Sequence, residues 1–226
     1  MKLKFEAVPE FINGAIQLEG SKSISNRLLI LQALCDGGFE INNLSPSDDT
    51  TTLKRLLALD ETTCDVGAAG TTMRFLTAYF ATRNCEKILT GSTRMQQRPI
   101  KILVDALAQL GASIEYLQND GYPPIAIHGK KLAGGNVSIR ADVSSQYISA
   151  LLMIGPSLEK GLHLTLEGKI SSFPYINMTL KTMEELGVMS KIDGNSITVH
   201  PAKYQSKIMQ AESDWSAASY YFSVCA

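Results

Sequence analysis

The feature that most constrains this chain is a helix pattern that returns along its 226 residues. One kind of segment spaces its apolar residues three and four apart and ends at a glycine or an acidic residue before a strand-like stretch. This pattern predicts amphipathic helices over residues 53–60, 102–111 and 178–187. Gly111 and Gly187 are expected to end their helices in the left-handed conformation, which glycine adopts without strain.

A second kind of helix begins with small hydroxyl or acidic residues, which suit the N-cap position. Its apolar residues cover more than one stripe, so these helices are expected to be buried. Four segments fit this description: Ser23–Leu34, Thr71–Ala81, Ser144–Ile154 and Asp214–Cys225.

Short strand-like pieces with alternating or β-branched side chains lie between the helices. They are Ala15–Leu18, Phe39–Leu44, Lys87–Thr90, Ala112–Leu117, Ile125–His128, Asn136–Arg140, His163–Glu167, Val188–Ile192 and Ser196–His200. Two helix types and several strands, repeated about three times, predict an α/β (α+β) fold of tandem βαβαββ units with an all-helix centre and outer sheets. The alternative is one α/β domain whose Leu-Gly helix ends coincide by chance.

Charge and composition narrow the classes of ligand. Lysine plus arginine number 21 and aspartate plus glutamate 22, so the net charge is −1 and no basic field exists for nucleic acid. No apolar run reaches the roughly 18–20 residues of a membrane-spanning helix, and the N-terminus lacks the apolar core of a signal peptide. The four cysteines have no C-x-x-C spacing, the three histidines lie far apart, and neither common nucleotide motif occurs. We expect a cytoplasmic protein without a metal site.

An anion can still be bound by local groups, because buried helices that start together point their free N–H groups at one place. The segment GSKSISNR at 20–27 opens the first buried helix. Lys22 and Ser23 lie at its cap, and Arg27 falls one turn further along the same face. A lysine, a hydroxyl and a forked guanidinium suit a phosphate or carboxylate. The alternative is a plain N-cap with two solvated cations.

Other segments carry similar chemistry. Gly70 lets the backbone of the second buried helix approach a ligand closely. Arg94 and Arg98 follow in a loop of small and polar residues, where uncompensated arginines suit an anion. The third helix start and a later loop carry hydroxyls, an amide and an aromatic ring, at Ser144, Ser145, Gln146, Ser172 and Tyr175. Ordinary caps, turns and solvated loops are the alternative for each.

Together and in this order, these segments resemble the 5-enolpyruvylshikimate-3-phosphate (EPSP) synthase family. The motifs span nearly the whole chain: GSKSISNR at 20–27, LSPSDDT at 44–50, AGTTMR at 69–74, LTGSTRMQQRPI at 89–100, VSSQYISALLM at 143–153, SFPYI at 172–176 and SDWSAASYYF at 213–222. Each motif alone is weak, but all of them in the family's order are specific.

The resemblance implies transfer of the enolpyruvyl group of phosphoenolpyruvate to the 5-hydroxyl of shikimate 3-phosphate, in the shikimate pathway of aromatic amino-acid biosynthesis. The reaction is an addition followed by loss of phosphate. The resemblance implies no metal or organic cofactor, small-molecule substrates as partners, and a mostly monomeric family. It also implies an inside-out α/β barrel lobe of three βαβαββ repeats, whose buried helices face a cleft between two lobes.

Carried over to this sequence, the resemblance assigns two overlapping sets of residues. Shikimate 3-phosphate would be bound by Lys22, Ser23, Arg27, Ser144, Ser145, Gln146, Ser172 and Tyr175. Phosphoenolpyruvate would be bound by Lys22, Gly70, Arg98 and Gln146. Lys22 is the candidate for the acid–base chemistry that proton transfer to C3 and from the 5-hydroxyl requires. Because both substrates are anionic, the cations must also reduce their mutual repulsion.

Two features inside the chain depart from the family pattern. Ala68 stands where the family usually has asparagine, so a polar contact on the phosphoenolpyruvate side is expected to be lost. The stretch from Asp49 to Gly67 is short. The second repeat is therefore expected to lack most of its strands and to leave an exposed sheet edge.

The third departure is that the chain ends at Ala226, inside an apolar helix-like run. We therefore expect residues 20–212 to form the N-terminal, shikimate 3-phosphate-binding lobe. Residues 1–19 are expected to be a strand segment that belongs to a second lobe, and residues 213–226 to be the start of that lobe. As such a fragment, the chain alone is expected to bind shikimate 3-phosphate weakly and to be inactive.

Two alternatives remain open. UDP-N-acetylglucosamine enolpyruvyl transferase shares the fold, but its first helix has K-N in place of K-S and it carries a reactive loop cysteine that no cysteine here matches. A non-catalytic lobe, which binds only a phosphorylated ligand or a partner, is the alternative from another class.

Overall fold

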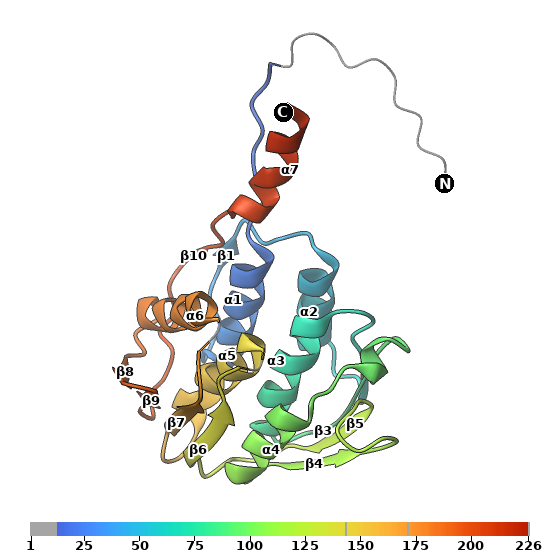
Figure 1. Ribbon diagram of the computed structural model, residues 1–226, viewed down its shortest axis with the longest axis vertical. Coiled ribbons are helices and arrows are strands. Elements are labelled where there is room, and N and C mark those ends of the chain that lie inside the picture. Colours follow the sequence, from blue (N-terminus) through green and yellow to red (C-terminus); the bar gives the residue numbers. More distant parts are fainter. Residues whose placement is uncertain (1–12, 143, 171, 226) are drawn as a thin grey trace.

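The computed structural model describes residues 13–142, 144–170 and 172–225 (Figure 1). Its α-helices are α1 (Lys22–Leu34), α2 (Asp48–Ala58), α3 (Gly70–Ala81), α4 (Lys101–Gln109), α5 (Ser145–Ile154), α6 (Phe173–Glu185) and α7 (Trp215–Cys225). Its strands are β1 (Ile41–Asn42), β2 (Thr63–Asp65), β3 (Glu86–Thr90), β4 (Ser113–Tyr116), β5 (Ile125–His128), β6 (Gly135–Arg140), β7 (Leu162–Glu167), β8 (Ser190–Asp193), β9 (Ser196–Val199) and β10 (Met209–Gln210).

Two complete βαβαββ units follow one another along the chain. The first runs β2-α3-β3-α4-β4-β5 and the second runs β6-α5-β7-α6-β8-β9. Each makes a four-stranded sheet of the same topology, with the orders β2-β3-β5-β4 and β6-β7-β9-β8. In both sheets the first two strands are parallel across a helical crossover, and the other pairings are antiparallel. The prediction of tandem units is confirmed.

A third, shortened unit consists of α1, β1 and α2, after which the chain enters β2 without a hairpin of its own. Its strand β1 pairs in parallel with β10, at Ile41↔Met209 and Asn42↔Gln210. The prediction of a strand-poor unit is confirmed, but this unit comes first along the described chain rather than second. The pairing with β10 covers one edge of β1, where we expected an exposed edge.

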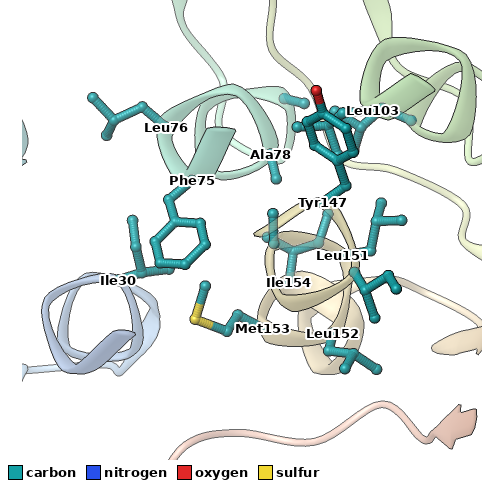
Figure 2. Close-up of a cluster of buried hydrophobic side chains, with 14 of the residues drawn as sticks. Ile30, Phe75, Leu76, Ala78, Leu103, Tyr147, Leu151, Leu152, Met153 and Ile154 are labelled. Atoms are coloured by element: carbon teal, nitrogen blue, oxygen red, sulfur yellow. The ribbon is translucent and has the colours of Figure 1, made fainter. Parts of the chain in front are cut away.

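The buried helices form the centre of the molecule. α1, α3 and α5 contact one another, and α2, α4 and α6 pack against them from outside. Figure 2 shows Ile30 of α1, Phe75 of α3 and Met153 of α5 pointing into the space between these helices. Each of these side chains is at most 1% exposed. The prediction of an all-helix centre is therefore confirmed.

Glycine and proline set the ends of the outer helices α4 and α6. Gly111 follows α4 with φ +98° and Gly187 follows α6 with φ +83°, as predicted. Helix α6 begins at Phe173, earlier than its apolar spacing predicts, because Pro174 is compatible with the first turn of a helix.

Two local predictions are wrong, and two short strands were missed. No strand forms over residues 15–18, and residues 13–20 have no regular structure, while residues 1–12 of the predicted 1–19 strand segment lie outside the described residues. The short strands β2 and β10 were not predicted. Helix α7 was predicted to be buried, but it projects from the body (Figure 1), and Trp215 is 81% and Tyr220 76% exposed. Across the described ranges, no helix has the length and apolar character needed to cross a membrane.

Candidate functional site

The starts of α1, α3 and α5 meet at one pocket of about 680 Å³, which we call the helix-end pocket. Its lining is polar and rich in hydroxyl groups. The lining residues are Gly20, Ser21, Lys22, Ser23, Arg27, Ser45, Ser47, Thr71, Ser144, Ser145, Gln146, Tyr175, Asp214, Ser216, Ala217 and Tyr220. Because the first turn of each helix has free N–H groups and the positive end of the helix dipole, this arrangement favours a bound anion.

Arg27 is a buried cation in the lining of the helix-end pocket, 3% exposed. Its Nε donates to the hydroxyl of Thr179 at 2.7 Å, and its Nη1 donates to the carbonyl of Ser23 at 2.7 Å. Its Nη2 donates to the hydroxyl of Ser149 at 2.9 Å and to the carbonyl of Tyr175 at 3.3 Å. All of these acceptors are neutral, and burial lowers the pKa of Arg27 to about 10. A desolvated guanidinium held only by neutral acceptors favours an incoming anion.

Lys22 and Ser23 form the first turn of α1, one turn before Arg27. The Lys22 side chain is 51% exposed, and its Nζ lies 3.5 Å from Oδ2 of Asp49 in the first turn of α2. The carbonyl of Asp49 accepts a hydrogen bond from the Thr72 hydroxyl at 2.9 Å, which joins α2 to α3. The Lys22 ammonium is therefore restrained on one side while it stays open to a ligand.

The start of α5 supplies neutral hydrogen-bonding groups. Ser144 caps this helix, because its Oγ accepts the backbone N–H of Gln146 at 3.4 Å. The side-chain amide of Gln146 donates to the Thr71 hydroxyl at 3.1 Å, which joins the starts of α5 and α3. Ser145 is half-buried, and the Tyr175 ring in the first turn of α6 is 47% exposed. Hydroxyl, amide and ring together suit a phosphorylated polyol.

A second hollow of about 410 Å³ adjoins the start of α3, and we call it the arginine pocket. It is lined by Ala68, Ser92, Arg94, Met95 and Arg98. The Arg98 guanidinium lies directly against Gly70, where a Cβ would clash with it. The next residue, Thr71, lines the helix-end pocket, so both pockets border the start of α3. This geometry can hold two anions side by side and offset their repulsion with cations.

The structure brings together nine of the ten predicted site residues. The helix-end pocket is lined by Lys22, Ser23, Arg27, Ser144, Ser145, Gln146 and Tyr175. Gly70 and Arg98 meet beside the arginine pocket. The exception is Ser172, which lies in the lining of neither pocket. It is the N-cap residue of α6, and its carbonyl accepts the backbone N–H of Tyr175 at 3.2 Å.

Sequence reasoning missed several groups around the helix-end pocket. Ser45 and Ser47 line it, and Asp49 pairs with Lys22. All of them belong to the LSPSDDT segment, which supported the resemblance without any role being assigned to its residues. The sequence signal that could have indicated Ser45 and Ser47 is a pair of hydroxyl residues just before the start of α2. The pairing with Lys22 depends on how α2 packs on α1, which no local spacing shows.

Comparison with known proteins now identifies the family. The family model of EPSP synthase (3-phosphoshikimate 1-carboxyvinyltransferase) matches residues 7–59 and 53–226. The chain belongs to the EPSP synthase family. A relative from Bacteroides fragilis strain YCH46, named 3-phosphoshikimate 1-carboxyvinyltransferase, is 49% identical over 221 residues, covering 97% of this chain and 54% of the relative. A relative of the same name from Actinobacillus pleuropneumoniae serotype 5b is 40% identical over 247 residues, covering 93% of this chain and 56% of the relative.

A solved structure shows the same fold. EPSP synthase from Acinetobacter baumannii superposes with a TM-score of 0.80 at 21% identity, over 92% of this chain and 52% of that one. The predicted resemblance to the EPSP synthase family is therefore confirmed. The chain spans about half the length of the relatives it matches.

Proposed function

We propose that this chain is the shikimate 3-phosphate-binding lobe of an EPSP synthase, which transfers the enolpyruvyl group from phosphoenolpyruvate to the 5-hydroxyl of shikimate 3-phosphate. The observation that carries the proposal is that three helix starts and the buried Arg27 converge on one hydroxyl-lined pocket. Membership of the EPSP synthase family supplies the reaction. The pocket supplies the chemistry that a phosphorylated polyol with a carboxylate requires.

Shikimate 3-phosphate would occupy the helix-end pocket. Its phosphate would accept hydrogen bonds from Ser144, Ser145 and the free N–H groups at the start of α5. Ser23 and Arg27 would bind the carboxylate and ring hydroxyls, with the Tyr175 ring alongside. We keep a phosphate contact for Ser172, because it lies in the same helix start as Tyr175, although it is outside the lining.

Phosphoenolpyruvate would occupy the arginine pocket, bound by Arg98 and by the backbone N–H of Gly70. Lys22 and Gln146 line the neighbouring pocket and would contact both substrates. The 5-hydroxyl would add to C2 of phosphoenolpyruvate while C3 gains a proton. Loss of phosphate, with return of a proton from C3, would then give the product. Lys22 would relay the proton that the 5-hydroxyl loses to C3, and the proton later lost from C3 would leave with the phosphate.

We further propose that residues 20–212 form this lobe and that residues 1–19 and 213–226 belong to a second lobe. The projection of α7 away from the body supports this division (Figure 1). The family resemblance also underlies our proposal of a cytoplasmic monomer that acts without a metal or organic cofactor.

Isothermal calorimetry with shikimate 3-phosphate tests the binding proposal. Ser23→Ala and Ser145→Ala each remove one hydroxyl from the pocket lining. Each should weaken binding about tenfold to a hundredfold, because a hydrogen bond to a charged group is worth about 1.5–3 kcal/mol. Arg27→Ala should abolish measurable binding. Ser138→Ala is the matched control, since this exposed serine lies on β6 outside both pockets.

Two results would contradict the proposal. Equal affinity in the unaltered chain and in all three pocket variants would show that the ligand binds elsewhere or not at all. Tighter binding of UDP-N-acetylglucosamine than of shikimate 3-phosphate, in a competition experiment, would favour the related transferase instead.

A further inference from the structure

Two buried side chains from different helices bind the same backbone atom beside Arg98. Tyr147 of α5 is 6% exposed, and its hydroxyl donates to the carbonyl of Pro99 at 2.6 Å. Arg74 of α3 is 4% exposed, and its Nη2 donates to the same carbonyl at 3.4 Å. Because Pro99 directly follows Arg98, these hydrogen bonds fix the end of the loop that carries the Arg98 guanidinium.

Arg74 also contacts the other neighbours of Arg98. Its Nη1 donates to the carbonyl of Gly70 at 3.0 Å and lies 3.7 Å from the sulfur of Met95. Gly70 lies against the Arg98 guanidinium, and the Met95 carbonyl accepts the Arg98 backbone N–H at 3.0 Å. One buried guanidinium therefore connects the Pro99 carbonyl, which follows Arg98, and the Met95 side chain, which precedes it, to the start of α3.

Tyr147 gives this arrangement a rigid support. Its ring packs with the hydrophobic cluster of α3, α4 and α5, while its hydroxyl points away from that cluster (Figure 2). The guanidinium carbon of Arg74 lies 5.9 Å from the centre of this ring. Neither residue lies in the lining of the helix-end pocket or the arginine pocket. Any effect of these residues on a ligand must therefore pass through the residues that they hold, and the hydrogen bonds from both residues meet at the Pro99 carbonyl, next to Arg98.

We propose that Arg74 and Tyr147 are positioning residues that set the direction of the Arg98 guanidinium and thereby the affinity for phosphoenolpyruvate. The inference rests on the proposed function, in which Arg98 binds that substrate. Holding the Arg98 guanidinium in place before the ligand arrives should strengthen binding, because a planar guanidinium makes two parallel hydrogen bonds to a phosphate or carboxylate only in one orientation.

The test is a Tyr147→Phe variant of the 226-residue chain, which removes one hydroxyl and leaves the ring. The matched control is Tyr204→Phe. Tyr204 is also 6% exposed, and its hydroxyl donates to the carbonyl of Met153 in α5 at 2.7 Å, away from both pockets. Phosphoenolpyruvate is titrated into each variant by NMR at saturating shikimate 3-phosphate. Shikimate 3-phosphate affinity and thermal unfolding are measured alongside.

Tyr147→Phe should weaken phosphoenolpyruvate binding roughly threefold to tenfold, the value of one hydrogen bond, without changing shikimate 3-phosphate affinity. Arg74→Lys, which loses the fork, should do the same, and Tyr204→Phe should change neither affinity. The Arg98→Ala variant separates the positioning role of Arg74 and Tyr147 from the proposed role of Arg98 in binding phosphoenolpyruvate. If Arg98→Ala weakens phosphoenolpyruvate binding but Tyr147→Phe does not, the positioning role is overturned and the proposed function stands.

The remaining outcomes are also decisive. Equal losses in Tyr147→Phe and Tyr204→Phe would show a general packing effect and overturn the positioning role. If the unaltered chain does not bind phosphoenolpyruvate, or binds it independently of Arg98, the proposed phosphoenolpyruvate site and the positioning role are both overturned.

Discussion

At the scale of single residues, Gly70 is the position where the smallest change should have the clearest effect. A methyl group there would collide with the Arg98 guanidinium. Helix α3 itself would tolerate the change, since alanine is favoured over glycine in helices by up to about 1 kcal/mol. Stability and ligand binding should therefore respond differently to the substitution.

We predict that Gly70→Ala weakens phosphoenolpyruvate binding about tenfold, because a displaced guanidinium loses a charge-assisted hydrogen bond of about 1.5–3 kcal/mol. The melting temperature should not fall. The measurements are an NMR titration and a thermal melt. Gly14→Ala is the control, since nothing lies within 4 Å of a Cβ at that position. Unchanged affinity would show that Arg98 moves aside without consequence.

At the scale of elements, an ion pair lies where a hairpin would otherwise follow α2 in the shortened first unit. The ammonium of Lys87 on β3 lies 2.9 Å from Oδ1 of Asp60 and 2.8 Å from the Glu61 carbonyl. The Lys87 side chain is only 6% exposed, whereas Asp60 is fully exposed. The hydrogen bond from Lys87 lowers the pKa of Asp60 below its ordinary 3.8.

The pH dependence of this pair follows from the sign of the shift. A lowered pKa of a carboxyl in the folded state means that the pair stabilises the fold above pH 3.8 and that this contribution is lost as the pH falls through the folded value. We predict that Asp60→Asn is less stable than the unaltered chain at neutral pH. The difference should disappear in acid, as measured by urea unfolding. A difference independent of pH would contradict the ion pair.

At the scale of the whole molecule, two pockets border the start of α3. Both proposed substrates would be bound there, yet the chain spans only about half the length of its relatives. Closing water out of such a site requires protein on both sides of the ligands. Helix α7, with Trp215 and Phe222 stacked at 6.1 Å, leaves an apolar surface uncovered in this structure.

We predict that the 226-residue chain binds shikimate 3-phosphate but forms no product when both substrates are present. The measurement is release of inorganic phosphate together with mass spectrometry of the product. The Bacteroides fragilis relative, assayed in parallel, is the positive control. Product formed by this chain alone, and lost in Lys22→Met, would overturn the prediction and show that one lobe is sufficient.

The sequence by itself determined the features that depend on neighbouring residues. The 3.6-residue periodicity indicated the helices, Gly111 and Gly187 indicated where two of them end, and the alternating segments indicated most of the strands. The polar residues at the three helix starts were also visible, because an N-cap and the charges next to it are local features.

Only the tertiary structure decided the features that depend on distant segments. The strand predicted over residues 39–44 is limited to the two residues of β1, and its partner β10 lies far along the chain, where no strand was predicted. The contact of Arg98 with Gly70 arises where the loop before α4 packs on α3, and that of Lys22 with Asp49 where α1 packs on α2. The position of Ser172 outside the pocket lining is likewise a matter of tertiary packing. The apolar residues of α7 predicted a buried helix. Burial, however, requires another segment to pack on the helix, and Trp215 and Tyr220 stay exposed in this structure.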